Sequence, residues 1–305
     1  MRIVITGATG AVGTALIAEG IRQNVEMLVI CRKASKRRQQ IPDHPLVKVL
    51  ELNMEEYETY QPPEGEMPYD VFYHFAWGGT TGDGRNDCEI QEKNIRYALD
   101  AAALAKRFGC SAFVGAGSQA EYGRVEGNLN SQTPAFPENG YGMAKLCAGQ
   151  MTRLYCRQAG MRHVWTRILS IYGPGDGAGS MVMSAIHRLL AGETPAFTKG
   201  EQQWDYLYSG DAAKALLLLG EKGHDGGVYC LGSGKARPLA DYIGMIRDAI
   251  DPRLSVALGA VPYAPGQVMY LCADIAKLKE DTGFAPEVSF EEGIKKTIMW
   301  VKEHG

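Results

Sequence analysis

Short runs of apolar residues alternate along the chain with longer stretches in which apolar residues recur every three or four positions. The short runs predict buried strands, and the longer stretches predict amphipathic helices. We expect strands at residues 2–6, 25–30, 47–50, 71–75, 112–115 and 164–168, and helices at residues 11–23, 89–107 and 141–159. Strands that alternate with helices are typical of βαβ units, so the pattern predicts an α/β fold with a doubly wound, mostly parallel sheet.

The regular alternation weakens beyond Gly173. Gly, Pro and Ser residues interrupt the later chain at residues 173–180, 232–238 and 261–266, and such clusters mark turns and loops. We therefore expect the C-terminal third to form a smaller, loop-rich lobe. Leucines 216–219 are expected to be the buried side of a helix that starts near Asp211.

Composition and charge exclude several classes of protein. Hydrophobic residues make up 45% of the 305 residues and charged residues 22%, which argues against disorder and membrane spanning. A net charge of −3 gives no field that would attract nucleic acid or an anionic membrane. The seven cysteines contain no Cys-x-x-Cys pair and the chain opens directly on a strand, so we expect a reduced, cytoplasmic protein. His163 and His187 have no metal-ligand cluster around them, so we expect them to be structural and no metal to be bound.

The first motif with chemical content is a glycine-rich turn between the first predicted strand and the first predicted helix. Residues 6–13 read Thr-Gly-Ala-Thr-Gly-Ala-Val-Gly. Gly7, Gly10 and Gly13 permit a tight turn and a close approach of the backbone to a pyrophosphate, whose charge then lies at the helix N-terminus. A plain strand-to-helix turn is the alternative, but the flanking elements favour dinucleotide binding and a Rossmann-type sheet.

The end of the second predicted strand bears on the choice of dinucleotide. An NAD site usually places an acid there to accept from the ribose 2′-hydroxyl, and this chain has none. Five cations occur within seven residues instead, namely Arg32, Lys33, Lys36, Arg37 and Arg38. They suit a 2′-phosphate, so we expect NADP(H) rather than NAD(H). A solvated basic loop or a minor nucleic-acid patch is the alternative.

Three residues form a candidate catalytic set. Ser118 follows the fifth predicted strand, and Tyr141 and Lys145 stand four residues apart, on one face of a predicted helix. An ammonium beside a phenol favours the phenolate, so we expect Lys145 to lower the pKa of Tyr141 and let it exchange a proton. Ser118 is placed to orient or polarise a substrate carbonyl. A chance surface pair is the alternative for Tyr141 and Lys145 taken alone.

The glycines, Ser118, Tyr141 and Lys145 together resemble the extended short-chain dehydrogenase/reductases, in the NAD-dependent epimerase/dehydratase branch. The resemblance runs nearly end to end, through His74-Phe75-Ala76-Trp77, Ser-Gln-Ala-Glu-Tyr-Gly at residues 118–123 and Arg-Ile-Leu-Ser-Ile-Tyr-Gly-Pro-Gly at residues 167–175. It implies a dinucleotide-binding domain at residues 1–169, to which residues 206–234 return. It also implies a smaller substrate lobe at residues 170–205 and 235–305.

The resemblance also implies residue roles. Tyr141 would be the general acid and base, Lys145 would tune it and hold the nicotinamide ribose, Ser118 would bond the reacting oxygen, and Asn94 would support a helix or a proton-relay water. Besides the glycines, Arg32, Lys33 and Arg37, the implied cofactor-binding residues are Thr9, Ala11, Val12, Asn53, Met54, Phe75, Ala76, Trp77, Asn94, Tyr141, Lys145 and Ile168. The implied substrate-binding residues are Trp77, Ser118, Gln119, Ser170, Met181 and Trp204.

Departures from the family pattern bear on the reaction. Sugar-nucleotide dehydratases carry an Asp-Glu pair directly after the serine position, where this chain has Gln119 and Ala120, so dehydration is disfavoured. Glu121 is either a displaced acid or a structural carboxylate. Two arginines that usually grip the substrate diphosphate are replaced by Trp204 and Ala264, which weakens the inference of a sugar nucleotide.

Three functions stay open after these departures. The cations after the second strand favour an NADPH-dependent reductase of a 4-keto nucleotide sugar. The alternative is a nucleotide-sugar epimerase that holds NAD tightly without net redox change. A non-catalytic regulator that senses NADP is a second alternative. Related proteins often dimerise by pairing the two long helices, here residues 89–107 and 141–159, so the resemblance also implies that a homodimer is possible.

Overall fold

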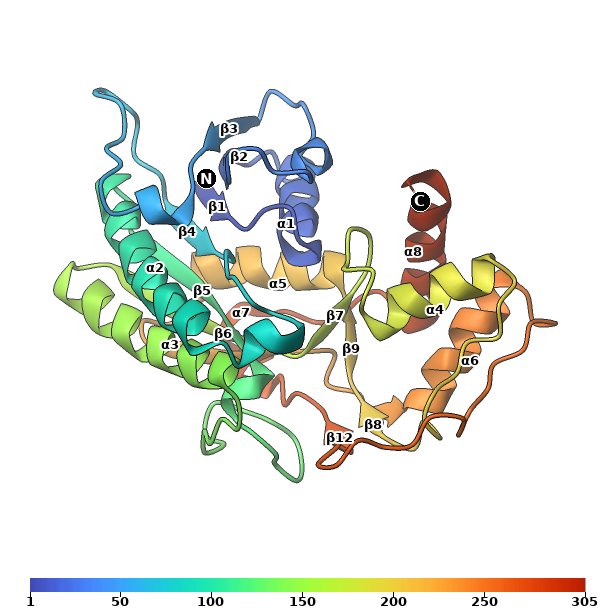
Figure 1. The fold of residues 1–305 in the computed structure, drawn as a ribbon. Helices are drawn as coiled ribbons and strands as arrows, with labels where there is room; N and C mark the ends of the chain where they lie inside the picture. Colours follow the sequence, from blue (N-terminus) through green and yellow to red (C-terminus); the bar gives the residue numbers. More distant parts are fainter. Residues whose placement is uncertain (305) are drawn as a thin grey trace.

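The apolar runs form one parallel sheet of seven strands at the centre of the molecule (Figure 1). The computed structural model describes residues 1–304. The strand order is β10–β6–β5–β4–β1–β2–β3, so the chain winds outward from β1 in both directions. The strands are β1 (Arg2–Thr6), β2 (Glu26–Cys31), β3 (Val47–Glu51), β4 (Val71–His74), β5 (Ala112–Ser118), β6 (Arg162–Ile168) and β10 (Gly227–Leu231). This is the doubly wound Rossmann arrangement that the sequence predicts.

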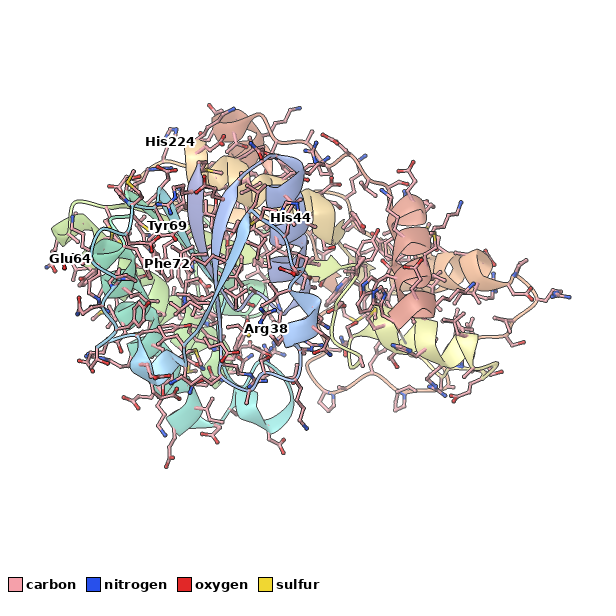
Figure 2. The ribbon with its side chains drawn as sticks, turned by 90° about the horizontal axis from the view of Figure 1, so that it is seen from above. Arg38, His44, Glu64, Tyr69, Phe72 and His224 are labelled. Atoms are coloured by element: carbon pink, nitrogen blue, oxygen red, sulfur yellow. The ribbon has the colours of Figure 1, made fainter. Side chains whose placement is uncertain are left out.

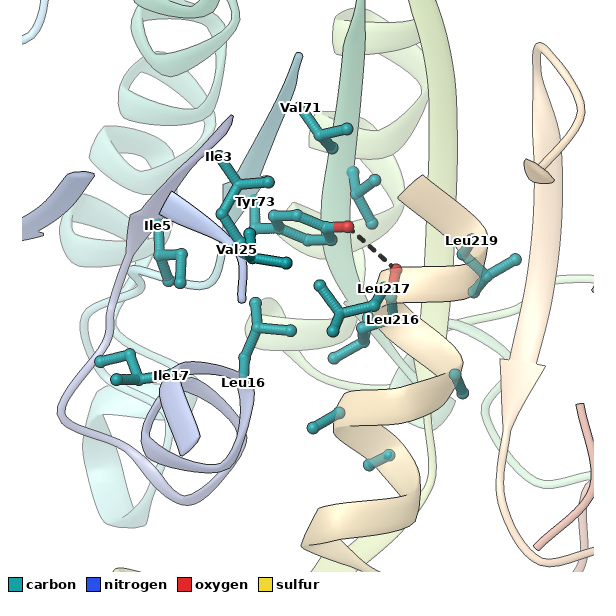
Figure 3. Packing of buried hydrophobic residues seen from close by; sticks show 14 of the residues in the cluster. Ile3, Ile5, Leu16, Ile17, Val25, Val71, Tyr73, Leu216, Leu217 and Leu219 are labelled. Atoms are coloured by element: carbon teal, nitrogen blue, oxygen red, sulfur yellow. Dashed lines mark hydrogen bonds between the residues drawn. The ribbon is translucent and has the colours of Figure 1, made fainter. Parts of the chain in front are cut away.

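Helices cover both faces of the sheet because its strands are apolar on both sides. The helices α1 (Ala11–Arg22), α5 (Ser209–Lys222) and α7 (Ala276–Thr282) contribute to the core on one face, which includes Ile3 and Ile5. On the other face Val4 packs with side chains of α2 (Cys88–Arg107) and α3 (Gly140–Gln158). Figure 3 shows the first core, where the Tyr73 hydroxyl donates to the backbone oxygen of Leu216 at 3.2 Å.

The C-terminal lobe contains three helices, α4 (Met181–Leu190), α6 (Leu239–Ile250) and α8 (Phe290–His304). They pack around an aromatic cluster in which Phe290 lies 4.6 Å from Tyr172 and 4.5 Å from Tyr242, between ring centroids. Its short strands are β7 (Ser170–Tyr172) with β9 (Tyr206–Tyr208), and β8 (Gln203–Trp204) with β11 (Arg237–Pro238) and β12 (Tyr270–Leu271). The expectation of a loop-rich lobe missed these helices. Figure 2 shows the lobe from above, beside the sheet.

Some element bounds differ from the sequence expectation for packing reasons. Strand β5 runs on to Ser118 although residues 115–117 read Gly-Ala-Gly. The indole of Trp165 occupies the space beside these glycines, since a Cβ at Gly115 would lie 2.2 Å from its ring. Helix α7, inside the expected lobe range 235–305, contributes Leu278 to the core beside α1 and α5.

Four short 3₁₀ helices lie after strands or within loops, mostly at the edge of the sheet that carries the candidate site. They are η1 (Arg38–Gln40), η2 (Met54–Glu56), η3 (Gly82–Arg85) and η4 (Gln119–Glu121). Open α/β sheets bind ligands at the carboxyl ends of their strands. Within residues 1–304 no helix has both the length and the apolar character needed to cross a bilayer.

Candidate active site

The turn from β1 to α1 is a close-packed glycine loop. Gly7 has a φ of +68°, and a Cβ there would lie 2.5 Å from the backbone nitrogen of Ala76 in the loop after β4. A Cβ at Gly13 would lie 2.5 Å from the Cα of Ala8. Glycine is therefore required at Gly7 for its left-handed backbone and at both positions for space.

Gly10, in contrast, faces open space. A Cβ at Gly10 would have the backbone oxygen of Gly7, 3.8 Å away, as its nearest neighbour. Gly10 caps α1 without a side chain, and the first turn of the helix carries no acidic residue. The N–H groups and the positive end of the helix dipole are thus free to meet an anion. The loop fits the pyrophosphate of a dinucleotide.

Thr6 fixes this loop against the loop that follows β4. Its Oγ1 accepts from the backbone nitrogens of Phe75 at 3.2 Å and Ala76 at 3.3 Å. The same oxygen lies 2.9 Å from Nδ1 of His74. Burial lowers the pKa of His74 to about 3, so the ring is neutral. The two loops expected to flank the cofactor are therefore held together by one buried hydroxyl.

The cations after β2 divide into two groups. The Lys33 ammonium pairs with Glu56, and the Lys33 backbone nitrogen donates to Asn53 Oδ1 at 3.0 Å. Asn53 also caps η2, which begins at Met54. Arg37 instead donates to the backbone oxygen of Thr9 at 3.3 Å, so its guanidinium lies against the glycine loop. Within residues 1–304 neither Arg32 nor Arg37 lies within ion-pair distance of a carboxylate. The charge of Arg37 does reach Asp176, whose pKa is raised by burial and lowered by Arg37.

Ser118, Tyr141 and Lys145 meet at the ends of β5 and α3. Lys145 Nζ donates to the backbone oxygen of Ala116 at 2.6 Å and lies 3.6 Å from the centroid of the Trp77 ring. The same nitrogen lies 5.7 Å from the centroid of the Tyr141 ring. The Trp77 and Tyr141 rings meet edge to face, 6.3 Å apart. Trp77, expected to touch both cofactor and substrate, thus contacts the candidate catalytic pair.

Burial determines the pKa values of Tyr141 and Lys145, and the pKa of Tyr141 differs from the sequence expectation. The pKa of Tyr141 is raised rather than lowered, because removal of the phenol from water outweighs the hydrogen bond with Ser118 and the charge of Arg85, while Glu121 raises it further. Burial also lowers the pKa of Lys145 to about 7, so burial disfavours the charged form of its amine. The expectation assumed a fully charged Lys145.

Asn94 and Gln91 hold the loop between β4 and α2. Asn94 Oδ1 accepts from the backbone nitrogen of Gly78, and its Nδ2 donates to the Gly78 oxygen, both at 2.9 Å. Gln91 accepts from Trp77 Nε1 at 3.0 Å and donates to the backbone oxygens of Gly79 and Gly84. The buried amide of Asn94 therefore fixes the backbone next to Trp77.

Glu121 is a structural carboxylate, the second of its two sequence interpretations. Its Oε1 accepts from the backbone nitrogen of Ser118 at 2.8 Å and from Trp165 Nε1 at 3.0 Å. Its Oε2 accepts from Arg167 Nε at 2.7 Å in a fully buried ion pair. Both oxygens are thus engaged, so Glu121 holds Ser118 in place and is not free to act as an acid.

Of the residues expected to bind the substrate, Trp204 and Ser170 contact each other directly. Trp204 Nε1 donates to Ser170 Oγ at 2.8 Å, which joins β8 to β7. Gln119 follows Ser118 directly in η4, and Met181 begins α4. Ile168 pairs with Ser118 across β6 and β5. Met181 itself packs against the apolar cluster of the lobe.

Sequence reasoning missed two residues of the site. Arg85 lies with its guanidinium carbon 4.3 Å from the centroid of the Tyr141 ring. Gln91 braces the loop that carries Trp77. Gln91 lies on the buried face of α2 and could have been found as a polar residue at an apolar position. Arg85 sits in a glycine-rich loop without periodicity, where no local signal marks it.

The model of the NAD dependent epimerase/dehydratase family matches residues 3–232. The chain belongs to this family. The predicted membership is confirmed, and the protein is an enzyme of the short-chain dehydrogenase/reductase type. The family is named for NAD, and nothing in the comparison favours NADP.

Relatives within the family differ in how much of the chain they match. A protein named "Putative UDP-glucose 4-epimerase" from Methanocaldococcus jannaschii is 24% identical over 99% of this chain and 99% of its own. A dTDP-glucose 4,6-dehydratase from Escherichia coli is 29% identical, over 56% of this chain and 51% of its own length. The structure of UDP-N-acetylglucosamine 4-epimerase from Methanobrevibacter ruminantium, in complex with UDP-N-acetylmuramic acid, superposes with a TM-score of 0.88 at 21% identity, over 100% of this chain and 99% of that one. The last likeness concerns the fold alone.

Proposed function

We propose that the enzyme epimerises one carbinol carbon of a nucleotide-linked sugar, with no net redox change. The observation that carries the proposal is the composition of the candidate site. Within residues 1–304, Tyr141 is accompanied by Ser118 and Lys145, and the carboxylate that acts on it, Glu121, is held in an ion pair with Arg167. Such a site can move one proton and position one oxygen. The similarity to an epimerase over 99% of both chains supports the same function.

The proposed chemistry divides between the bound dinucleotide and the chain. A dinucleotide held at the Gly7–Gly13 loop would supply a nicotinamide that can take up a hydride and give it back. Tyr141 takes the hydroxyl proton as the hydride leaves the sugar carbon. After the ketone has turned its opposite face toward the nicotinamide position, Tyr141 gives the proton back to the ketone oxygen. Ser118 orients the reacting oxygen, and Lys145 in its charged form favours the ionised form of Tyr141.

Elimination of water, the reaction of the dehydratases, needs an additional acid. Gln119 and Ala120 supply none. Glu121 is held by Ser118, Trp165 and Arg167 below the site and would have to break a buried ion pair to take part. Breaking such a pair leaves an unpaired charge in the interior and costs about 3 kcal/mol or more. The site therefore favours epimerisation or reduction over dehydration.

A 4-keto reductase that uses NADPH is the second candidate. The observation that favours it is the position of two guanidinium groups. Arg32 directly follows β2, where NAD enzymes place an acid, and Arg37 lies against the glycine loop. Guanidinium groups bind a 2′-phosphate through charge-assisted hydrogen bonds. The same Tyr141 would then protonate the ketone oxygen once in each turnover.

We further propose that the sugar lies between the sheet and the lobe, near Trp77 and the bonded pair of Trp204 and Ser170. The superposed 4-epimerase is described with a UDP-sugar, which supports a nucleotide sugar here. Trp204 and Ala264 offer no guanidinium fork for a diphosphate. The substrate is therefore expected to be held more by aromatic contact than by paired arginines.

Product analysis separates these functions. The purified protein is incubated with UDP- and dTDP-hexoses, first with no added cofactor and then with NADPH and 4-keto sugars, and products are identified by NMR. Epimerisation without added cofactor, with NAD released on denaturation, supports the first proposal. Stoichiometric NADPH oxidation supports the reductase. Turnover that survives Tyr141→Phe contradicts both.

We also propose that two copies pair through α2 and α3, which lie side by side in Figure 1. Met143, Met151 and Leu154 on α3 are exposed by 54%, 43% and 42%, and Ile90 on α2 by 38%. Large apolar side chains on one helix face suit burial in an interface. Sedimentation should show a dimer that Met151→Glu converts to a monomer, and a wild-type monomer would contradict the proposal.

A further inference from the structure

Arg85 is a cation in direct contact with the proposed proton-exchanging residue. It ends η3, in the loop between β4 and α2, and its guanidinium carbon lies 4.3 Å from the centroid of the Tyr141 ring. A guanidinium at this distance over an aromatic face makes a cation–π contact, and the attraction grows when the phenol becomes a phenolate. Neither the family match nor the motifs point to this residue.

The loop that carries Arg85 is fixed at several points. Arg85 Nη1 donates to the backbone oxygen of Thr80 at 3.0 Å. Gln91 donates to the oxygen of Gly84 at 2.8 Å. Asn86 Oδ1 accepts at 3.0 Å from the backbone nitrogen of Gly140, the first residue of α3. Because these bonds join η3 to the first turn of α3, the guanidinium is held at the Tyr141 ring.

The charges that face Tyr141 come from three elements. Lys145 on α3 is buried, and burial lowers its pKa to about 7. Glu121 on η4 is paired with Arg167. Arg85 on η3 stays charged at every physiological pH, and no carboxylate within residues 1–304 forms an ion pair with it. The hydroxyl of Ser118 completes the surroundings.

We propose that Arg85 is a positioning residue, which holds the Tyr141 ring and favours its ionised form through the charge of its guanidinium. The proposal rests on the proposed function only through the role of Tyr141. It states a property of the free enzyme, namely that the ionisation of Tyr141 depends on Arg85.

The test is therefore a titration that needs no substrate. The protein is labelled with ¹³Cζ-tyrosine, and the Tyr141 signal is assigned by its loss in Tyr141→Phe. In Arg85→Met the NMR midpoint of Tyr141 should rise by about one pH unit, as expected for removal of a partly buried cation at this distance. Arg85→Lys should shift it less. Arg157→Met, which removes an exposed guanidinium from the far end of the same helix, should leave it unchanged.

Kinetics supply the second readout. In Arg85→Met the acidic limb of the pH–rate profile for the oxidation step should move to higher pH by the same amount as the NMR midpoint of Tyr141, with KM within about twofold of wild type. Asn86→Ala, which keeps the charge of Arg85 and frees its loop, should move the acidic limb less. A raised KM with an unmoved midpoint would show that Arg85 binds an anionic part of the substrate and would overturn the proposal. A midpoint that does not rise, or a wild-type Tyr141 that never titrates, would overturn it as well. Failure of every sugar to react would reject the proposed function and leave the titration result standing.

Discussion

Lys145 places an ionisable amine in the interior, and its replacement should make the fold more stable. Its side chain is buried, and burial lowers its pKa from 10.5 to about 7. An unfolded lysine keeps a pKa near 10.4, so unfolding takes up a proton between about pH 7 and pH 10.5. The cost of the buried charge is therefore fully present below pH 7, falls as pH rises, and is absent above about pH 10.5.

The size of the effect follows from the shift. At ~1.4 kcal/mol per pKa unit, the cost is about 5 kcal/mol at pH 6 and about 1 kcal/mol at pH 10. Lys145→Met keeps the apolar stem and removes the charge. It also removes the hydrogen bond to the Ala116 oxygen, which is worth about 1 kcal/mol and leaves that acceptor unpaired. The variant should thus be more stable than wild type by about 3 kcal/mol at pH 6 and no longer more stable at pH 10.

Urea unfolding followed by circular dichroism at pH 6, 8 and 10 measures this difference. Lys106→Met, on the exposed side of α2, is the matched control and should change stability by less than about 0.5 kcal/mol at each pH. Turnover should be lost in Lys145→Met only. If Lys145→Met is less stable than wild type at pH 6, or if the difference does not depend on pH, then burial does not penalise the charged form of Lys145.

Three further predictions concern the buried ion pair, the glycine turn and the cations after β2. Glu121→Gln leaves the buried guanidinium of Arg167 without its carboxylate, so urea unfolding should show a loss of about 3 kcal/mol, and an unchanged midpoint would refute the structural role. Gly7→Ala drives a Cβ to 2.5 Å from the backbone of the loop after β4, whereas Gly65→Ala, with a similar φ of +79°, meets open space. The first variant should therefore lose more stability than the second, and equal losses would contradict the close packing. Arg37→Glu should weaken NADPH binding at least tenfold in calorimetry and NADH binding by less than about twofold, and equal losses would show that Arg37 does not bind the 2′-phosphate.

The sheet and the glycine turn could be predicted because each depends on local pattern. The run Ile3, Val4 and Ile5 is apolar on both faces, as a strand covered on both sides requires. Gly7 and Gly13 belong to a turn whose backbone constraints act within a few residues. Ser118, Tyr141 and Lys145 follow from their spacing once the strands and helices are in place.

The parts that the sequence did not predict depend on packing between distant segments. Strand β5 continues through Gly115 and Gly117 because the ring of Trp165, from the next strand, fills the space beside them. The ionisation of Lys145 depends on how completely α3 is buried against the sheet, which spacing does not reveal. Arg85 reaches Tyr141 only because its loop docks on the first turn of α3.

The most direct test of the account is the fate of one sugar carbon. The enzyme, purified without added cofactor, is incubated with a UDP-hexose in deuterated buffer, and the sugar is followed by NMR beside a Tyr141→Phe sample. The account predicts an equilibrium mixture of two epimers with hydrogen retained at the inverted carbon, because the hydride returns to the carbon it left, and no reaction in Tyr141→Phe. Formation of a 4-keto-6-deoxy product, or epimerisation that persists without Tyr141, would contradict it.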